Sequence, residues 1–135
     1  MAIQYSAAVR NAELDALETA VGTGAIMKIR SGSAPATVAT ADSGTVLATI
    51  SLGSDWMSAA SGGSKSKSGT WQDASADATG TAAHFRIYAS DGTTAHIQGT
   101  VTVTGGGGDL TLDSVSITAA QVVTISSFTI TAGNA

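Results

Sequence analysis

The first stretch of the chain shows a helical spacing of apolar residues. These recur mainly at three- and four-residue steps and comprise Ala7, Leu14, Leu17 and Val21. The pattern predicts a helix over residues 6–21, with Ser6 as its N-cap and Gly22 as its stop, although Arg10 interrupts the stripe. A helix of this length is marginal alone in water, so the stripe must pack either on its own β-domain or on a neighbouring subunit.

After Gly24 the spacing changes to the alternation that is typical of strands. The clearest strand-like runs are 26–30, 45–52, 110–118 and 122–131, and two more flank the Asp91 and Gly92 turn. Composition predicts flexible loops at 58–69 and 73–80. Roughly seven to nine short strands predict a mainly β fold, an antiparallel β-sandwich of jelly-roll type with one N-terminal helix. The chain then divides into a helix or arm, 1–24, and a single sandwich domain, 25–135.

The hairpin around Gly92 allows a register to be predicted. Aligning apolar positions pairs Ala89 with Ala95, Ile87 with Ile97, and Phe85 with Gly99. This register favours a loop of three or five residues centred on Gly92. It gathers a polar set on the other, wetter face: His84, Arg86, Tyr88, His96, Gln98 and Thr100. Tyr88 is then expected opposite His96, and Arg86 opposite Gln98.

Composition narrows the classes of function. The chain has 25 Ala, 19 Thr, 17 Ser and 16 Gly, which together fill 77 of its 135 positions, and it has no cysteine. Disulfides, thiolate catalysis and zinc–cysteine sites are therefore excluded. The net charge of −4 argues against a broad basic surface for nucleic acid, and no apolar run is long enough to span a membrane. The polar start of the chain lacks a secretory signal pattern, so we expect synthesis in the cytoplasm.

Candidate catalytic and metal-binding residues do not form a recognisable set. The two histidines, His84 and His96, fall roughly 13 Å apart in the predicted register, at about 3.3 Å per residue, too far to share a metal. No serine has the flanking glycines of a hydrolase elbow. The acid pairs Asp73/Asp77 and Asp109/Asp113 lack the dense ligands of a calcium loop. We therefore expect neither an enzyme nor a cofactor.

Two tryptophans and two lysines are the remaining candidates for binding. Trp56 and Trp71 are expected to anchor a core that is poor in aromatic residues; exposed in a groove, they would instead indicate a carbohydrate-binding module. Lys65 and Lys67 are expected in a solvated loop, because two lysines are too few for nucleic-acid affinity.

Three segments together resemble small structural proteins of tailed bacteriophages. They are AIQYSAAVRNAELDALETAVG, SGSAPAT, and the long stretch GSDWMSAASGGSKSKSGTWQDASADATGTAAHFRIYASDG. Some such proteins are capsid decoration, or cement, proteins. The resemblance implies a β-sandwich on the outside of the phage head, at a junction between capsomers. It implies the major capsid protein and further copies of this chain as partners, and it carries no catalytic residues.

A decoration protein stabilises a shell by contact, so the useful prediction is its contact surface. We expect that surface to include the helix stripe and the lysine-bearing loop, namely Leu14, Leu17, Val21, Lys65 and Lys67. The alternatives are a tail, neck or fibre-associated virion protein, or a carbohydrate-binding sandwich module. A hydrolase is the least supported reading.

Overall fold

A single helix opens the fold in the place that the sequence predicts. The computed structural model describes residues 3–133, and α1 spans Ala7–Val21. The hydroxyl of Ser6 accepts a hydrogen bond from the amide of Val9 at 3.3 Å, which satisfies one of the free donors at the helix start. The amide of Gly22 donates to the carbonyl of Glu18 at 2.9 Å and closes the last turn. The predicted helix, cap and stop are confirmed.

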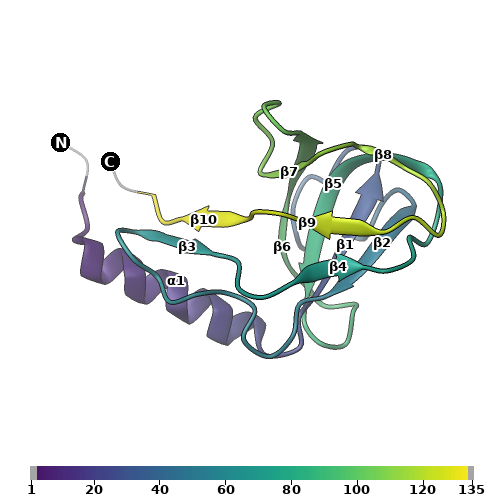
Figure 1. Cartoon of the computed structure of the whole chain (residues 1–135). Coiled ribbons are helices and arrows are strands. Elements are labelled where there is room, and N and C mark those ends of the chain that lie inside the picture. Colours follow the sequence, from purple (N-terminus) through teal and green to yellow (C-terminus); the bar gives the residue numbers. More distant parts are fainter. Residues whose placement is uncertain (1–2, 134–135) are drawn as a thin grey trace.

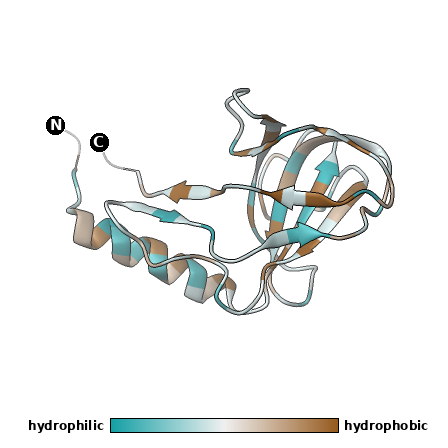
Figure 2. Ribbon diagram, viewed as in Figure 1, coloured by the Kyte–Doolittle hydropathy of each residue, from teal (hydrophilic) through white to brown (hydrophobic). Residues whose placement is uncertain are grey.

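The body of the molecule is a curled mixed sheet, a half-barrel (Figure 1). Its strands are β1 (Ile26–Ser31), β2 (Val46–Ser51), β5 (Gly80–Tyr88), β6 (Ala95–Val103), β7 (Leu110–Leu112) and β8 (Ser116–Ile117). They lie in the order β2-β1-β5-β6-β7, and β8 pairs with β5. Breaks in register occur along β1 and β5, and such bulges bend and twist a sheet. Figure 2 shows apolar and polar residues alternating along these strands.

The predicted fold class is confirmed only in its coarser part. The chain is mainly β with one helix, but an antiparallel sandwich is not what the pairing shows, because β6 and β7 run parallel. The glycine-rich segment 104–109 joins these two strands and carries the chain back along β6 within six residues.

Two small ribbons complete the fold. In one, β4 (Trp71–Asp73) pairs with β9 (Val123–Ile125); in the other, β3 (Ser64–Ser66) pairs with β10 (Thr129–Thr131), both antiparallel. The β3–β10 ribbon lies beside α1, and the three elements form an arm that extends from the half-barrel (Figure 1). The prediction of a flexible loop over 58–69 is therefore wrong, because this segment supplies a strand and makes backbone hydrogen bonds at Ser58 and Ser61.

A row of four aromatic rings connects the arm to the half-barrel. Trp56 and Trp71 lie 6.2 Å apart between ring centroids, Phe128 lies 5.5 Å from Trp71, and Phe85 lies 5.5 Å from Phe128. Both indoles are fully buried, and each N–H donates to a backbone carbonyl at 3.1 Å. The expectation that the tryptophans are packing anchors is confirmed.

The β5–β6 hairpin follows the predicted register over most of its length. Three predicted pairs are present, Phe85 with Gly99, Arg86 with Gln98, and Ile87 with Ile97, and His84 pairs with Thr100 in the same register. The register then shifts, so that Tyr88 pairs with Ala95, and the predicted pairings of Tyr88 with His96 and of Ala89 with Ala95 are wrong. The carboxylate of Asp91 accepts the amides of Thr93 and Thr94 and holds this loop in its shifted form.

Candidate functional site

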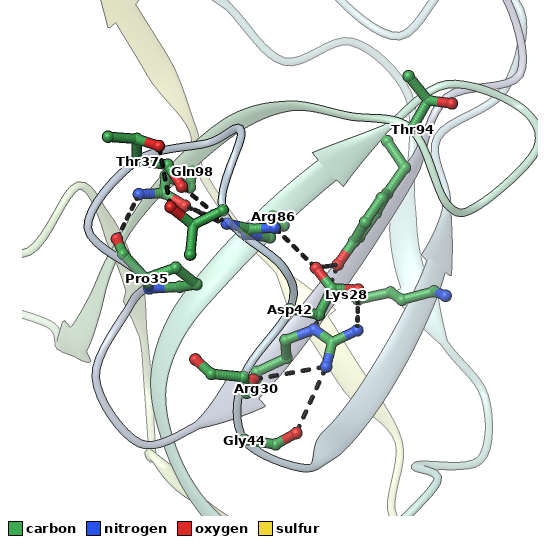
Figure 3. A network of polar contacts seen from close by, with 12 residues as sticks. Lys28, Arg30, Pro35, Thr37, Asp42, Gly44, Arg86, Thr94 and Gln98 are labelled. Carbon is green, nitrogen blue, oxygen red and sulfur yellow. Dashed lines mark hydrogen bonds and ion pairs between the residues drawn. The ribbon is translucent and has the colours of Figure 1, made fainter.

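A dense group of charged and polar side chains lies on the polar face of β1, β5 and β6. The hairpin register predicted that this face is wet, but His84, Arg86 and Tyr88 are all buried. The cover is the segment of residues 32–44, which joins β1 to β2 and folds back across the sheet; we call it the strap (Figure 3). The expectation of a wet face is therefore wrong for these three residues, and holds for the exposed His96 and Thr100.

The carboxylate of Asp42, on the strap, is the centre of this face. Its Oδ2 accepts from Arg30 at 2.8 Å, and its Oδ1 accepts from Arg86 and from the hydroxyl of Tyr88, both at 2.8 Å. Arg30 Nε also donates to the Tyr88 hydroxyl oxygen at 3.2 Å. One carboxylate thus serves two guanidinium groups and a phenol that are almost wholly removed from water, and charge-assisted contacts of this kind are the stronger hydrogen bonds of proteins.

Further contacts fasten the backbone of the strap to the sheet. Gln98 donates to the carbonyl of Pro35 at 2.8 Å, and Arg86 donates to the carbonyl of Thr37 at 3.0 Å. The amide oxygen of Gln98 in turn accepts two hydrogen bonds from Arg86, at 2.8 and 3.1 Å. Side chains from the sheet beneath the strap therefore bind two of its backbone carbonyls and the carboxylate of Asp42 (Figure 3).

The surroundings of Asp42 favour its charged form. Burial acts to raise the pKa of the Asp42 carboxyl, but the hydrogen bonds from Tyr88 and Arg86 and the charges of the two arginines outweigh it and hold that pKa below its ordinary value. Burial and the hydrogen bond to Asp42 raise the pKa of Tyr88, so the phenol keeps its proton and remains a donor. Arg30, Arg86 and Tyr88 therefore all act as hydrogen-bond donors to an anionic group, the carboxylate of Asp42.

Two more basic side chains complete this face. Lys28 donates to the carbonyl of Gly92 at 2.8 Å, and its ammonium lies 5.0 Å from the centre of the Tyr88 ring. His84 Nδ1 lies 2.7 Å from the carbonyl of Gly32, and because a carbonyl oxygen can only accept, Nδ1 carries a proton and donates it in this hydrogen bond. Its Nε2 is buried with no hydrogen-bond partner among residues 3–133. Lys28, Arg30 and Arg86 thus share this face, and Asp42 forms the ion pairs with both arginines.

The predicted partner-contact residues lie in the arm, and most of them face the chain itself. Leu14 and Val21 are buried, and Leu17 packs, half-buried, against the core. Lys65 is 3% exposed and bonds to Asp15 at 2.7 Å and to Glu18 at 2.9 Å, which joins β3 to α1. The expectation that Lys65 is solvated in a loop is wrong, because its neighbours on the helix bring two carboxylates over β3.

Lys67 differs from Lys65 in its surroundings. It is half-buried, donates to the carbonyl of Gly69 at 2.7 Å and lies 5.8 Å from the centre of the Trp71 ring.

Arg10, which interrupts the helix stripe, donates twice to the carbonyl of Ala132, the residue directly after β10, at 2.9 and 3.1 Å. The helix of the arm is thereby tied to both strands of its ribbon.

The other candidate groups have local roles. Asp73 accepts the amide of Thr49 and Asp77 accepts the hydroxyl of the same residue, while Asp109 accepts from Thr100. Within residues 3–133, no three His, Asp or Glu side chains gather to hold a metal ion. In the same part of the chain, α1 is the sole helix, and it is too short and too polar to cross a membrane.

The residues that centre this face, Asp42 and Arg30, were not singled out from the sequence. A usable signal existed in residues 26–30, where Lys28 and Arg30 alternate with apolar residues and therefore share one face of a strand.

Comparison of the chain with protein-family models, curated proteins and solved structures gives no match.

Proposed function

We propose that this chain is a non-enzymatic structural protein of a virion, of the capsid decoration type. The observation that carries the proposal is that all its cationic side chains are engaged with the chain itself. Arg30, Arg86 and Lys65 are buried in ion pairs, while Arg10, Lys28 and Lys67 donate to backbone carbonyls. Each of the six is buried or half-buried, whereas most of the Asp and Glu side chains are exposed, so acidic groups dominate the exposed charge; this suits contact with other proteins and opposes attraction to nucleic acid.

The arm gives such a protein a means of contact. Exposed apolar side chains lie in the first turn of α1 and in the segment directly before it, where Ile3, Tyr5 and Val9 are 78%, 47% and 46% exposed. Apolar residues gathered at one exposed place are typical of surfaces that other proteins cover. A projecting arm can therefore reach a neighbouring capsid subunit or a second copy of this chain.

Decoration needs no chemistry. A protein that binds an assembled shell better than its separate subunits raises the free energy needed to open the shell, by mass action.

The β-sandwich architecture belongs to the same proposal: the β4–β9 ribbon crosses the half-barrel near β2, as a small second layer would (Figure 1). A carbohydrate-binding module draws no support from the tryptophans, since neither ring is exposed.

The test is to find the chain in its particle. Virions encoded by the genome that carries this sequence are purified, and mass spectrometry and electron cryomicroscopy are used to look for the chain. We expect many copies on the outer face of the head, each with its arm on a neighbour. Density at the tail or neck would favour the alternative virion role, and absence from the particle would refute both.

A matched pair of variants tests the arm. Val9→Asp changes an exposed apolar residue at the arm's end, whereas Thr23→Asp changes an exposed residue beyond the helix. Purified wild-type chain is added to heads that lack it, and the temperature at which the heads release DNA is measured. We expect wild type and Thr23→Asp to raise that temperature and Val9→Asp to raise it less. Equal effects of both variants would exclude the arm as the contact.

A further inference from the structure

We propose that Arg30, Arg86 and Tyr88 form a carboxylate-binding site, which Asp42 fills in the free protein and which an acidic side chain of a partner protein can fill in its place. The inference does not depend on where in a virion the chain lies. It rests on the geometry around Asp42, on the charges of the sheet face and on the construction of the strap.

The geometry is that of carboxylate recognition. The two oxygens of Asp42 are divided between the two arginines, one oxygen to each at 2.8 Å, and the Tyr88 hydroxyl adds a third donor at 2.8 Å. The donors come from β1 and β5, which pair with each other in the main sheet, so the backbone that carries them does not depend on the strap. Gln98 holds Arg86 from the far side, at 2.8 Å. A planar anion with two oxygens fits this arrangement.

The charges point to the same class of ligand. Lys28, Arg30 and Arg86 lie on one face, and among the described residues Asp42, whose side chain is 35% exposed, is the ion-pair partner of both arginines. A buried guanidinium without a counter-charge is costly, so the face requires an anion whenever Asp42 leaves it. The partial exposure of Asp42 also means that the site opens to solvent at this point.

The strap is built to be displaced. None of residues 32–44 is buried, so little apolar surface holds it down, and it contains no strand. It begins and ends at Gly32 and Gly44, whose φ angles are +74° and +71°, in the left-handed region that favours glycine. Segments with few buried apolar contacts open at lower free energy than the core. The strap therefore opens more easily than the sheet that carries the three donors.

The first experiment empties the site. Asp42→Ala is compared with Asp91→Ala, which removes an exposed aspartate from another loop. Thermal unfolding is followed while acetate replaces chloride at constant ionic strength. Acetate should stabilise Asp42→Ala alone, and at ten times its Kd the folding equilibrium shifts about 11-fold. Adding Arg30→Lys to Asp42→Ala should weaken the acetate response. If Asp42→Ala does not fold, Asp42→Ser, which retains a polar side chain, takes its place.

The second experiment uses the wild-type chain. A tethered side chain competes at an effective concentration of order millimolar, so acetate is raised well above that level and above the Kd of the variant. Hydrogen exchange of the backbone amides should then become faster in residues 32–44 in acetate than in chloride, with β5 unchanged.

Three results would overturn the proposal. The first is an acetate effect no larger in Asp42→Ala than in Asp91→Ala, which would make Asp42 only a structural ion-pair partner. The second is strap exchange in the wild type that is the same in both salts. The third is tighter binding of inorganic phosphate than of acetate to Asp42→Ala, which would replace the carboxylate by a phosphate group as the ligand.

Discussion

The ion-pair cluster between the arm's helix and ribbon gives a sharp test of how the arm is held. Lys65 is 3% exposed and lies 2.9 Å from Glu18, whose side chain is 18% exposed, and 2.7 Å from Asp15, whose side chain is 53% exposed. Replacing Lys65 by Met keeps the length of the side chain and removes its charge. Glu18 is then left largely covered, and the amide of Met57 is its remaining hydrogen-bond donor among the described residues.

The expected cost follows from these exposures. At 2.9 Å and an effective dielectric constant of about 20, the gross attraction between Lys65 and Glu18 is at most about 6 kcal/mol, and desolvation of the ions offsets most of it. Removing one partner of a fully buried pair costs about 3–5 kcal/mol, and exposed pairs contribute about 0.2–1 kcal/mol. Because this cluster is partly solvated, we expect Lys65→Met to cost about 1–3 kcal/mol.

The dependence on pH has a defined sign. The hydrogen bond from Lys65 lowers the pKa of Asp15, so this contribution is present above its ordinary value of 3.8 and is lost as the pH falls through the lower folded value. Burial acts to lower the pKa of Lys65, but the hydrogen bonds to Asp15 and Glu18 raise it above its ordinary 10.5. The lysine contribution is therefore complete below 10.5 and is lost as the pH rises through the folded pKa.

Urea unfolding at several pH values is the assay. At pH 7 the midpoint of Lys65→Met should fall by roughly 1 M, and the difference from wild type should shrink below pH 3.8. Lys67→Met is the matched control, because Lys67 makes no ion pair among the described residues and should change stability little. An equal loss in both variants, or a Lys65→Met loss that is unchanged at pH 3, would refute the reasoning.

Three further predictions concern packing and a turn. A Cβ on Gly99 would lie 2.7 Å from the ring of Phe85, so Gly99→Ala should cost about 1–3 kcal/mol in urea unfolding, while Gly133→Ala, with open space around it, should be close to neutral. Trp56→Phe removes a donor to a backbone carbonyl and part of a buried ring, and should lower the melting temperature measured by circular dichroism. Hydrogen bonds from Thr hydroxyl and backbone donors lower the pKa of Asp91, so Asp91→Ala should melt earlier at pH 7, and the difference in melting temperature should narrow as the pH falls below 3.8.

The local sequence pattern predicted the structure correctly where residues close together in the sequence determine it. The helix, its Ser6 cap and its Gly22 stop follow from spacing and from side-chain chemistry within a few residues. The register of β5 against β6 followed from matching apolar positions, until the Asp91 turn shifted it after Ile87. Burial of the tryptophans followed from the shortage of other large residues.

The strap and the arm escaped prediction because both depend on contacts between distant residues. Residues 32–44 contain Gly, Ala, Ser and Thr and no strand pattern, yet Asp42 finds Arg86, 44 residues later, and the polar face becomes buried. In the same way Ser64–Ser66 has the composition of a loop and becomes a strand because Thr129–Thr131 pairs with it. Alternation shows which residues share a face, but it does not show what covers that face.

The arm is built from elements that lie far apart in the sequence, and this sets the order in which a newly made chain can fold. The arm needs α1, β3 and β10, and the last of these is completed only with Thr131, after every strand of the main sheet has been made. Until then α1 has emerged from the ribosome without the carbonyl of Ala132 to receive Arg10, and an isolated helix of 15 residues is marginal in water. A nascent chain stalled after β8 would have all the strands of its main sheet, while its helix would still lack the β10 half of its ribbon.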